Sequence, residues 1–509
     1  MNQSPLSDRE SGEERKVRVS RPKVRTGCVI CKSRHKKCDE GQPSCLMCIR
    51  SGRVCEYRET VDRRRRRPSI DHHLDHSRSI VTVAPASCTN LDADERRYLD
   101  FFRQTTAAQC AGYLYEEFWQ RLIHQVSEAE PAVCHAVIAL GALHYRFLQL
   151  RMGAVAHSFR ALDPTFSVQQ CNKAIGCLRQ MLMADRSSRH STEVALVTCI
   201  SLVSTLLFLE DAQWAGHHLR SGLKLLGEYT SDNRDQSSVS LTIQQAFAGL
   251  HLGWLAFSAP EAVIVDDPFS SLVPTTVVAE PSRDIATVGN SVIALARRVL
   301  CEGHSLCTEE VDTLFRELCG WQRTIKQCAI ALQGSSPQRD RAALMLLELW
   351  SEVLYIILGV EKQSVSQPRE TRYDAFLAHF QHMVELAKRL LLTTASRQEG
   401  SMPTFSVNVG VNAPLFFCGF KCREWLVRQE ALLLLRRWRR QEGIWSTDGT
   451  TRILARVIEI ESEGLGAEDV IPLPARIESV HVEFSEAGSG LCLWYRRAGD
   501  ENWTTEWVR

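Results

Sequence analysis

The apolar residues of the chain follow a helical spacing over most of its length. From residue 91 onward they recur every three or four positions in segments such as EEFWQRLIHQV, AVCHAVIALGALHYRFL and RAALMLLELWSEVLYIILGV, as on the buried face of an α-helix. Asp92 and Glu95 precede one such run, and Pro131 opens another at a first-turn position that proline tolerates. The stretch is long enough to bury one large core or two ordinary ones. We therefore predict a mostly α-helical domain over residues 91–509.

Four segments of this domain carry more specific expectations. Residues 194–209 lack charge but are dotted with Ser and Thr, and they are too short and too polar for a membrane span, so we expect a core helix and no membrane partner. The segment REWLVRQEALLLLRRWRRQ has a helical period throughout, whereas LCLWYRRAGDENW fits either a strand or a last helix. The acidic residues around 459–464 are interpreted as a solvated helix face.

Six cysteines near the N-terminus repeat one spacing, C-x2-C-x6-C, in two successive halves. The first half holds Cys28, Cys31 and Cys38, and the second holds Cys45, Cys48 and Cys55. A structural zinc ion takes four thiolate or imidazole ligands in a tetrahedron. One ion would leave two cysteines over and two separate ions would need eight, so six thiolates satisfy two ions only if two of them bridge. The repeat suggests Cys28 and Cys45 as the bridges, because each opens its own half.

These cysteines have two other interpretations. A disulfide framework needs an oxidising compartment, yet the N-terminal MNQSPLSDRESGEERKVRVS has no apolar segment typical of a signal peptide. The remaining cysteines are scattered, mostly within apolar helical segments, as in a reducing interior. A zinc module that serves only protein contacts is the second alternative. The charge distribution argues against it.

The net charge of +1 hides a split along the chain. Residues 1–67 hold 19 Lys+Arg and 9 Asp+Glu, a net of +10, and the remaining residues hold 42 and 51, a net of −9. A basic module joined to a mildly acidic body is typical of a nucleic-acid binder. Six thiolates and two zinc ions sum to −2, so the nearby basic residues exceed what the cluster itself needs. We expect the surplus to face the DNA backbone.

Residues 27–57, GCVICKSRHKKCDEGQPSCLMCIRSGRVCEY, resemble the fungal zinc binuclear cluster (Zn2Cys6) DNA-binding domain in all six cysteines, the basic run, Asp39 and Pro43. The resemblance implies two zinc ions, with the first and fourth cysteines as bridges. One ion would take Cys28, Cys31, Cys38 and Cys45. The other would take Cys28, Cys45, Cys48 and Cys55.

The resemblance also implies a DNA-binding mode, in which the helix after the second cysteine enters the major groove of double-stranded DNA. The residues expected to contact DNA are Lys32, Arg34, His35, Lys36 and Lys37. Arg34 and His35 match positions that read base edges, commonly of GC-rich, CGG-like triplets, and the lysines would contact phosphates. His35 departs from the Lys or Arg usual at its position. In an unbroken helix Arg34 and His35 would lie on the side of the cysteines, so this assignment requires the helix to end early.

The flanking segments are expected to lack a fold of their own. We predict a disordered tail over residues 1–20, the zinc domain over 21–60 and a basic flexible linker over 61–90. The linker contains a basic run that is a candidate nuclear import signal and would also contact DNA phosphates. Its residues are Arg63, Arg64, Arg65, Arg66 and Arg67. No heptad pattern persists between Tyr57 and Arg97. The chain is therefore expected to bind DNA as a monomer, or as a homodimer formed through its C-terminal domain.

The helical domain resembles the fungal-specific transcription factor regulatory domain in three stretches, LDADERRYLDFFRQTT, EFWQRLIHQVSEAEPAVCHAVIALGALH and ALVTCISLVSTLLFLEDAQWAGHHLRSGLKLL. The implied function is a nuclear, sequence-specific transcription regulator of RNA polymerase II genes that acts with the transcription machinery as an activator. Such proteins frequently control secondary-metabolite gene clusters. The alternative is a zinc-stabilised interaction adaptor or corepressor without its own DNA target. An enzyme is not expected, since HExxH, P-loop and GxSxG motifs are missing from the sequence.

Overall fold

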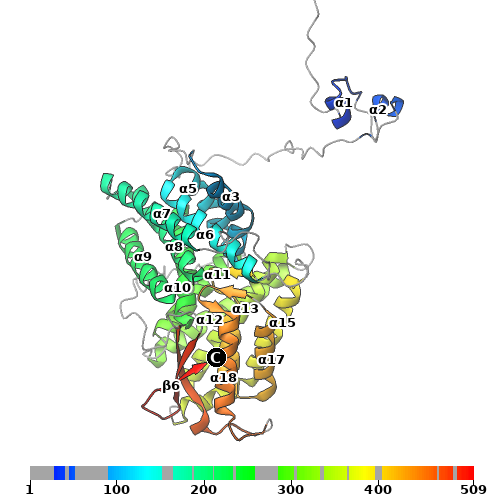
Figure 1. Ribbon diagram of the computed structural model, residues 1–509. Coiled ribbons are helices and arrows are strands. Elements are labelled where there is room, and N and C mark those ends of the chain that lie inside the picture. Colours follow the sequence, from blue (N-terminus) through cyan, green and yellow to red (C-terminus); the bar gives the residue numbers. More distant parts are fainter. Residues whose placement is uncertain are drawn as a thin grey trace, which may run out of the picture. The chain divides into compact units, whose positions relative to one another are not determined.

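The computed structural model describes most of the chain (Figure 1). The described residues are 28–39, 45–51, 55, 90–151, 164–185, 188–209, 211–232, 237–257, 285–302, 307–332, 338–363, 366–395, 404–438, 440–466, 469–484 and 490–508. They fall into two compact units, Met1–His76 and Ser77–Arg509. The expected tail at residues 1–20 and the arginines at 63–67 lie outside the described residues.

The first unit has a core made of cysteine rather than of aliphatic side chains. Its helices are α1 (Val29–Ser33) and α2 (Leu46–Arg50). Its buried core residues are Cys28, Cys31, Cys38, Cys45 and Cys48, with Ile30, Met47 and Cys55 packed around them. Two five-residue helices cannot bury enough apolar surface to stabilise a fold. The stabilising free energy must therefore come from what the thiols bind.

The second unit is mostly helical, as the sequence predicts. Its first helices are α3 (Ala93–Phe101), α4 (Ala107–Ala111), α5 (Ile123–Ala129), α6 (Pro131–Arg151), α7 (Thr165–Ala184), α8 (Arg189–Phe208), α9 (Ala212–Asp232) and α10 (Ser238–Phe257). The later ones are α11 (Ile285–Glu302), α12 (Thr308–Ala331), α13 (Gln338–Lys362), α14 (Arg369–Arg372), α15 (Leu377–Ala395), α16 (Asn412–Lys421), α17 (Trp425–Arg437) and α18 (Thr447–Glu461). Short π- and 3-10-helical turns are η1 (Phe102–Thr106), η2 (Glu117–Leu122), η5 (Tyr373–Phe376) and η6 (Leu473–Ala475).

The helices pack in two neighbouring groups with a continuous core. In the first group α6 contacts α3, α5, α7 and α8, and in the second α13 contacts α11, α12, α15 and α16. The contact between α10 and α11 joins the groups, and one cluster of buried apolar side chains extends through both. The predicted start of α3 is confirmed: Asp92 caps the helix, and Glu95 bonds back to the Asp92 amide.

The uncharged segment at residues 194–209 forms most of α8, a core helix as predicted. Three helical segments are long and apolar enough to cross a membrane by length and composition, Pro131–Leu150, Arg189–Phe208 and Gln338–Lys362. Between 67% and 78% of their apolar windows is buried inside the folded unit. In α8 the buried hydroxyls of Thr198, Ser201, Ser204 and Thr205 donate to carbonyls one turn earlier. These bonds satisfy the polar groups that made the segment look too polar.

Two small sheets accompany the helices. Strands β1 (Thr404–Ser406), β2 (Arg440–Glu442) and β3 (Trp445–Ser446) pair in that order, β1 with β2 in parallel and β2 with β3 antiparallel. Strands β4 (Ile477–Phe484), β5 (Leu491–Arg497) and β6 (Thr504–Val508) form an antiparallel meander. The ambiguous segment LCLWYRRAGDENW is thus a strand at its start. Its buried residues alternate, with Leu491, Leu493 and Tyr495 on the inner face.

The prediction that REWLVRQEALLLLRRWRRQ is helical throughout is wrong at its C-terminal end. Helix α17 ends at Arg437, and the chain then enters β2. A distant hydroxyl stabilises the break: Thr447 Oγ1 accepts a hydrogen bond from the Arg440 amide at 2.7 Å and donates to the Trp438 carbonyl at 2.8 Å. Helical spacing continues through this stretch, but a tertiary contact decides its backbone.

The interpretation of residues 459–464 as a solvated helix face is also wrong at Glu461. Glu459 on α18 is exposed, but Glu461 is fully buried. Its carboxylate accepts from Arg423 at 3.0 Å, from the Ile477 amide at 2.5 Å and from Arg428. Burial raises the pKa of Glu461, and the two arginines outweigh it and lower that pKa. Helices α17 and α18, side by side in Figure 1, and strand β4 meet at this carboxylate.

Candidate metal centre and nucleic-acid interface

The two halves of the cysteine repeat have the same local geometry. Cys28 precedes α1, and its Sγ accepts a hydrogen bond from the Cys31 amide at 3.3 Å. In the first half the Cys28 amide donates to Cys38 Sγ at 3.4 Å, and in the second the Cys45 amide donates to Cys55 Sγ at 3.3 Å. Equivalent amides therefore hold equivalent sulfurs. The sequence repeat is a structural repeat of two ligand-bearing loops, each followed by a short helix.

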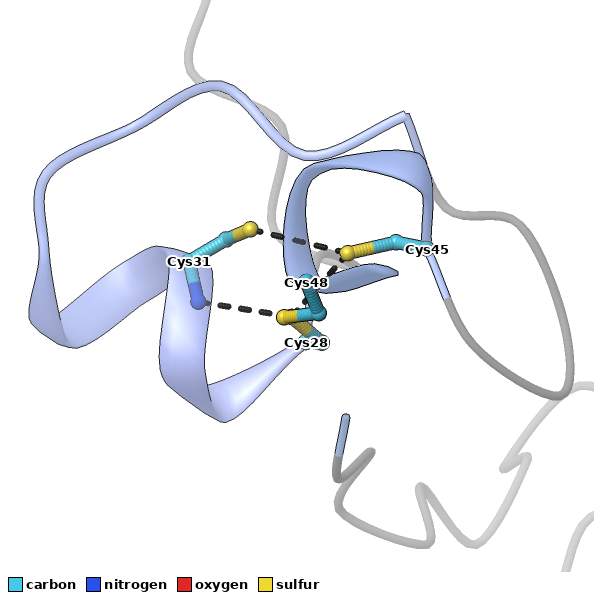
Figure 2. A group of neighbouring side chains, drawn as sticks. All are labelled: Cys28, Cys31, Cys45 and Cys48. Carbon is cyan, nitrogen blue, oxygen red and sulfur yellow. Dashed lines mark hydrogen bonds between the residues drawn. The ribbon is translucent and has the colours of Figure 1, made fainter. Parts of the chain in front are cut away.

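The sulfurs lie at the separation that a shared tetrahedral metal imposes (Figure 2). The Sγ atoms of Cys28 and Cys45, of Cys28 and Cys48, and of Cys31 and Cys45 are each 3.7 Å apart. Two sulfurs bonded to one zinc at the usual length lie about 3.8 Å apart in a tetrahedron. These four sulfurs are also within 4.8 Å of one another. The arrangement fits zinc ligation.

Burial and mutual hydrogen bonds shift the pKa values of these thiols in opposite directions. Burial raises the pKa of Cys31 to about 12, and it also raises the pKa of Cys45 and Cys48. At Cys28 burial acts in the same direction, but hydrogen bonds from Cys31, Cys48 and Cys45 outweigh it and lower the pKa to about 6. Four adjacent thiolates are therefore unfavourable without a positive charge between them. A divalent zinc ion supplies that charge and the folding free energy that the small core lacks.

Asp39 connects the two halves of the zinc domain, a role that its place in the sequence did not predict. Its carboxylate oxygens accept hydrogen bonds from the Leu46 amide at 3.0 Å and the Met47 amide at 3.4 Å, the first amides of α2. Carboxylates are favourable at this end of a helix. Cys38 Sγ, Asp39 and Cys45 Sγ also lie within 4.8 Å of one another. An acidic residue inside a basic run was the available signal.

Helix α1 ends early, as the assignment of Arg34 and His35 requires. After Ser33 the Lys36 amide donates to the Cys31 carbonyl at 3.0 Å, and the His35 amide donates to the Lys32 carbonyl at 3.2 Å. His35 has a φ of 53°. These features define a Schellman C-cap, in which the left-handed residue is usually glycine. The left-handed turn takes the chain out of the helix, so that the residues after Ser33 do not continue along its axis.

The five residues predicted to contact DNA, Lys32, Arg34, His35, Lys36 and Lys37, are all exposed. They come immediately after the buried Cys31 in the sequence, so one short segment joins the metal centre to the protein surface. Arg34 Nη1 also donates a hydrogen bond to Ser51 Oγ at 3.2 Å. The sequence pattern did not predict a role for Ser51. The candidate import signal at residues 63–67 lies outside the described part of the chain.

Comparison with known proteins finds a relative that matches most of this chain and others that match only a short part of it. A relative from Emericella nidulans, the aspercryptin biosynthesis cluster-specific transcription regulator atnN, is 22% identical over 411 residues, covering 72% of this chain and 64% of the relative. The Zn(2)-C6 fungal-type transcription factor afumD of Aspergillus fumigatus is 29% identical over 146 residues, 28% of this chain and 38% of the relative. The transcriptional regulatory protein pro1 of Neurospora crassa is 51% identical over only 37 residues.

The long alignment extends the similarity into the helical body, yet this chain matches less than two thirds of the length of either of the first two relatives. No solved structure matches the chain. The family model described as the fungal Zn(2)-Cys(6) binuclear cluster domain matches residues 26–64, which contain all six cysteines. Residues 26–64 of this chain therefore belong to the fungal Zn(2)-Cys(6) binuclear cluster family, whose six cysteines hold two zinc ions.

Proposed function

We propose that this protein is a nuclear transcription regulator that binds double-stranded DNA through its zinc cluster and acts on RNA polymerase II genes, most simply as an activator. The observation that carries the proposal is the exposed basic segment after Cys31, positioned directly on the metal centre. Zinc alone would not require this segment, because the cysteines that would hold it are buried, whereas the basic side chains are exposed. A polyanionic partner accounts for it.

The proposed ligand sets have Cys28 and Cys45 as bridges. One ion takes Cys28, Cys31, Cys38 and Cys45, and the other takes Cys28, Cys45, Cys48 and Cys55. Two contacts support this division: Cys45 lies 3.7 Å from Cys31 of the first set, and Cys28 lies 3.7 Å from Cys48 of the second. Each bridging sulfur thus approaches a terminal ligand of the opposite half, as sharing between two ions requires.

The two halves differ in charge, which favours the first half as the DNA-binding face. Residues 32–37 read KSRHKK, whereas the equivalent residues 49–54 read IRSGRV. In the proposed mode α1 lies at the major groove and Arg34 makes a bidentate contact to guanine O6 and N7. Lys32, Lys36 and Lys37 contact phosphates, which fix the register without specifying sequence. His35 contacts the next base with a shorter and less charged side chain than Lys or Arg.

The wider role follows from the relatives. The name of the Emericella nidulans relative states that it regulates a biosynthesis cluster, and we propose the same class of role here, control of a secondary-metabolite gene cluster. The tail at residues 1–20, the zinc domain at 21–60, the linker at 61–90 and the regulatory domain at 91–509 remain the proposed domain limits. Arg63, Arg64, Arg65, Arg66 and Arg67 are the proposed import signal. A homodimer on DNA would form through the helical domain.

Selection of binding sites from random duplexes by the zinc-loaded full-length chain tests the proposal. The expected result is enrichment of a GC-rich triplet, with affinity that falls as salt rises. Recovery of duplexes that does not depend on salt and enriches no sequence would contradict the proposed function. It would favour the adaptor or corepressor without a DNA target.

Two substitutions separate reading from positioning at the proposed interface. Arg34→Ala should relax specificity at one base step by about 1–3 kcal/mol, because it removes a base contact. Lys36→Ala should weaken binding to all sequences, because it removes a phosphate contact. The salt slope, which is the slope of log K against log salt concentration, should become shallower by roughly 0.9. Competition binding at several salt concentrations measures both effects. Identical behaviour of the two variants would refute the assignment.

A further inference from the structure

Arg34 and Ser51 occupy equivalent places in the two halves of the zinc domain. Each is the third residue after the second cysteine of its half, Cys31 or Cys48. Both side chains are exposed, and Arg34 Nη1 donates to Ser51 Oγ at 3.2 Å. The base-reading candidate of the first half is thus bonded to its own counterpart in the second half.

Ser51 is oriented to accept this bond. Its hydroxyl donates to the Met47 carbonyl at 2.8 Å, one turn earlier in α2. A hydroxyl has a single proton, so the oxygen presents lone pairs to Arg34, and a guanidinium has donors only. The Ser51 amide also donates to the Cys48 carbonyl at 3.2 Å. The acceptor is therefore fixed to the helix that carries the metal ligand Cys48.

The bond leaves the recognition edge of Arg34 available. Nε–H and Nη2–H form one edge of the planar guanidinium, and Nη1 lies at the opposite corner. The Nε–Nη2 edge has the fork geometry that matches two acceptors on guanine. A long side chain that is already held loses less conformational freedom when it binds. Ser51 would thus lower the ordering cost of the Arg34 contact.

We propose that Ser51 is a positioning residue for DNA recognition, which holds the Arg34 guanidinium at the groove-facing surface before DNA arrives. The inference rests on the proposed function of the zinc domain. Ser51 itself acts through Arg34 and contributes its effect at the single base pair that Arg34 reads. Specificity in this protein would therefore depend on both halves of the cluster, although one half carries most of the basic residues.

The test compares zinc-loaded full-length variants on three duplexes: the selected site, the same site with one base pair changed, and a random duplex. Ser51→Ala should reduce discrimination at one base pair by roughly 3–10-fold, the effect of freeing one long side chain. Binding to the random duplex and the salt slope should stay unchanged, and Ser51→Thr should restore discrimination. Ser33→Ala is the matched control, since the exposed Ser33 hydroxyl donates to the Ile30 carbonyl at 3.0 Å.

A double-mutant cycle makes the test specific to the pair. In an Arg34→Ala background, Ser51→Ala should cause no further loss of discrimination. An equal loss in both backgrounds, or discrimination by Ser51→Ala that matches the wild type, would overturn the inference. So would a loss of bound zinc in Ser51→Ala, which would make its role structural. Absence of salt-dependent duplex binding by the wild type would instead refute the proposed function.

Discussion

His35 illustrates how one residue position combines a backbone role with a place in the proposed DNA interface. Its φ of 53° makes it the only non-glycine residue with positive φ among the described residues. The position equivalent to His35 in the second half is Gly52, four residues after Cys48 as His35 is after Cys31. A glycine at the repeated position was a signal for a left-handed turn. Histidine tolerates this conformation better than most residues do, and unlike glycine it keeps a side chain at the proposed DNA interface.

Substitution at His35 should therefore change the stability of the zinc domain. His35→Val should cost about 1–2 kcal/mol, because a β-branched residue is strained at positive φ. His35→Gly should retain or slightly raise stability. The measurement is the chelator concentration at which half of the zinc is released. Lys37→Val is the control, exposed and without positive φ. Equal loss in His35→Val and Lys37→Val would show that the turn carries no strain.

At the scale of elements, buried polar contacts fix how neighbouring helices and strands meet. Glu95 joins α3 to α7: its carboxylate accepts from Lys173 Nζ at 2.6 Å and Gln170 Nε2 at 2.8 Å. Gln170 in turn bonds His135 Nδ1 of α6 at 2.7 Å. Burial raises the pKa of Glu95. The hydrogen bonds that its carboxylate accepts from Lys173, Gln170 and the Asp92 amide outweigh burial and lower that pKa to about 2.

The lowered pKa predicts acid sensitivity of the α3–α7 contact. Because the folded pKa of Glu95 lies below its ordinary value of 4.5, its stabilisation is complete above pH 4.5 and is lost as pH falls towards 2. Glu95→Gln should remove about 1–2 kcal/mol at neutral pH, after allowing for solvent screening of the half-exposed Lys173, and should flatten the pH dependence in this range. Urea unfolding followed between pH 5 and 2.5 measures this. The exposed Glu117→Gln is the control. A pH profile unchanged in Glu95→Gln would contradict the account.

Glu461 gives a sharper test, because α18 also carries an exposed glutamate two residues away. Glu461→Gln should cost about 3–5 kcal/mol, since it leaves the buried Arg428 without its counter-charge and leaves the buried Arg423 with Glu370 alone. Glu459→Gln should change stability by less than about 1 kcal/mol, because its pair with Arg456 is exposed. Chemical unfolding followed by helical circular dichroism compares the two. Similar costs would mean that the buried ion network does not stabilise the α17–α18–β4 junction.

These elements also mark how far the sequence can predict this protein. The cysteine cluster was predictable because ligand number and spacing are local properties of the chain. The helical body was predictable from its apolar period. The end of α17 was not, because Thr447 stabilises it from outside the segment. Three further features could not be predicted for the same reason: the hydrogen bond from the first amide of α2 to the Asp39 carboxylate, the bond from Arg34 to Ser51, and the burial of Glu461. Each depends on residues that only the fold brings together.

The whole molecule combines two units that are stabilised in different ways. The helical unit has an extended apolar core, whereas the core of the zinc unit consists of the cysteines themselves. The family match is confined to residues 26–64, while the similarity to the Emericella nidulans relative extends over 72% of the chain. DNA recognition is therefore expected to depend on zinc, and the fold of the helical unit is expected to be independent of it.

The number of zinc ions per chain tests the central claim most directly. Native mass spectrometry of the reduced full-length chain, titrated with zinc, should show two ions bound. Cys45→Ala should impair both ions, because Cys45 is one of the two proposed bridges, whereas Cys55→Ala should impair one. A single ion in the wild type, or equal effects of Cys45→Ala and Cys55→Ala, would contradict a binuclear cluster in which six thiolates hold two ions through two bridging sulfurs.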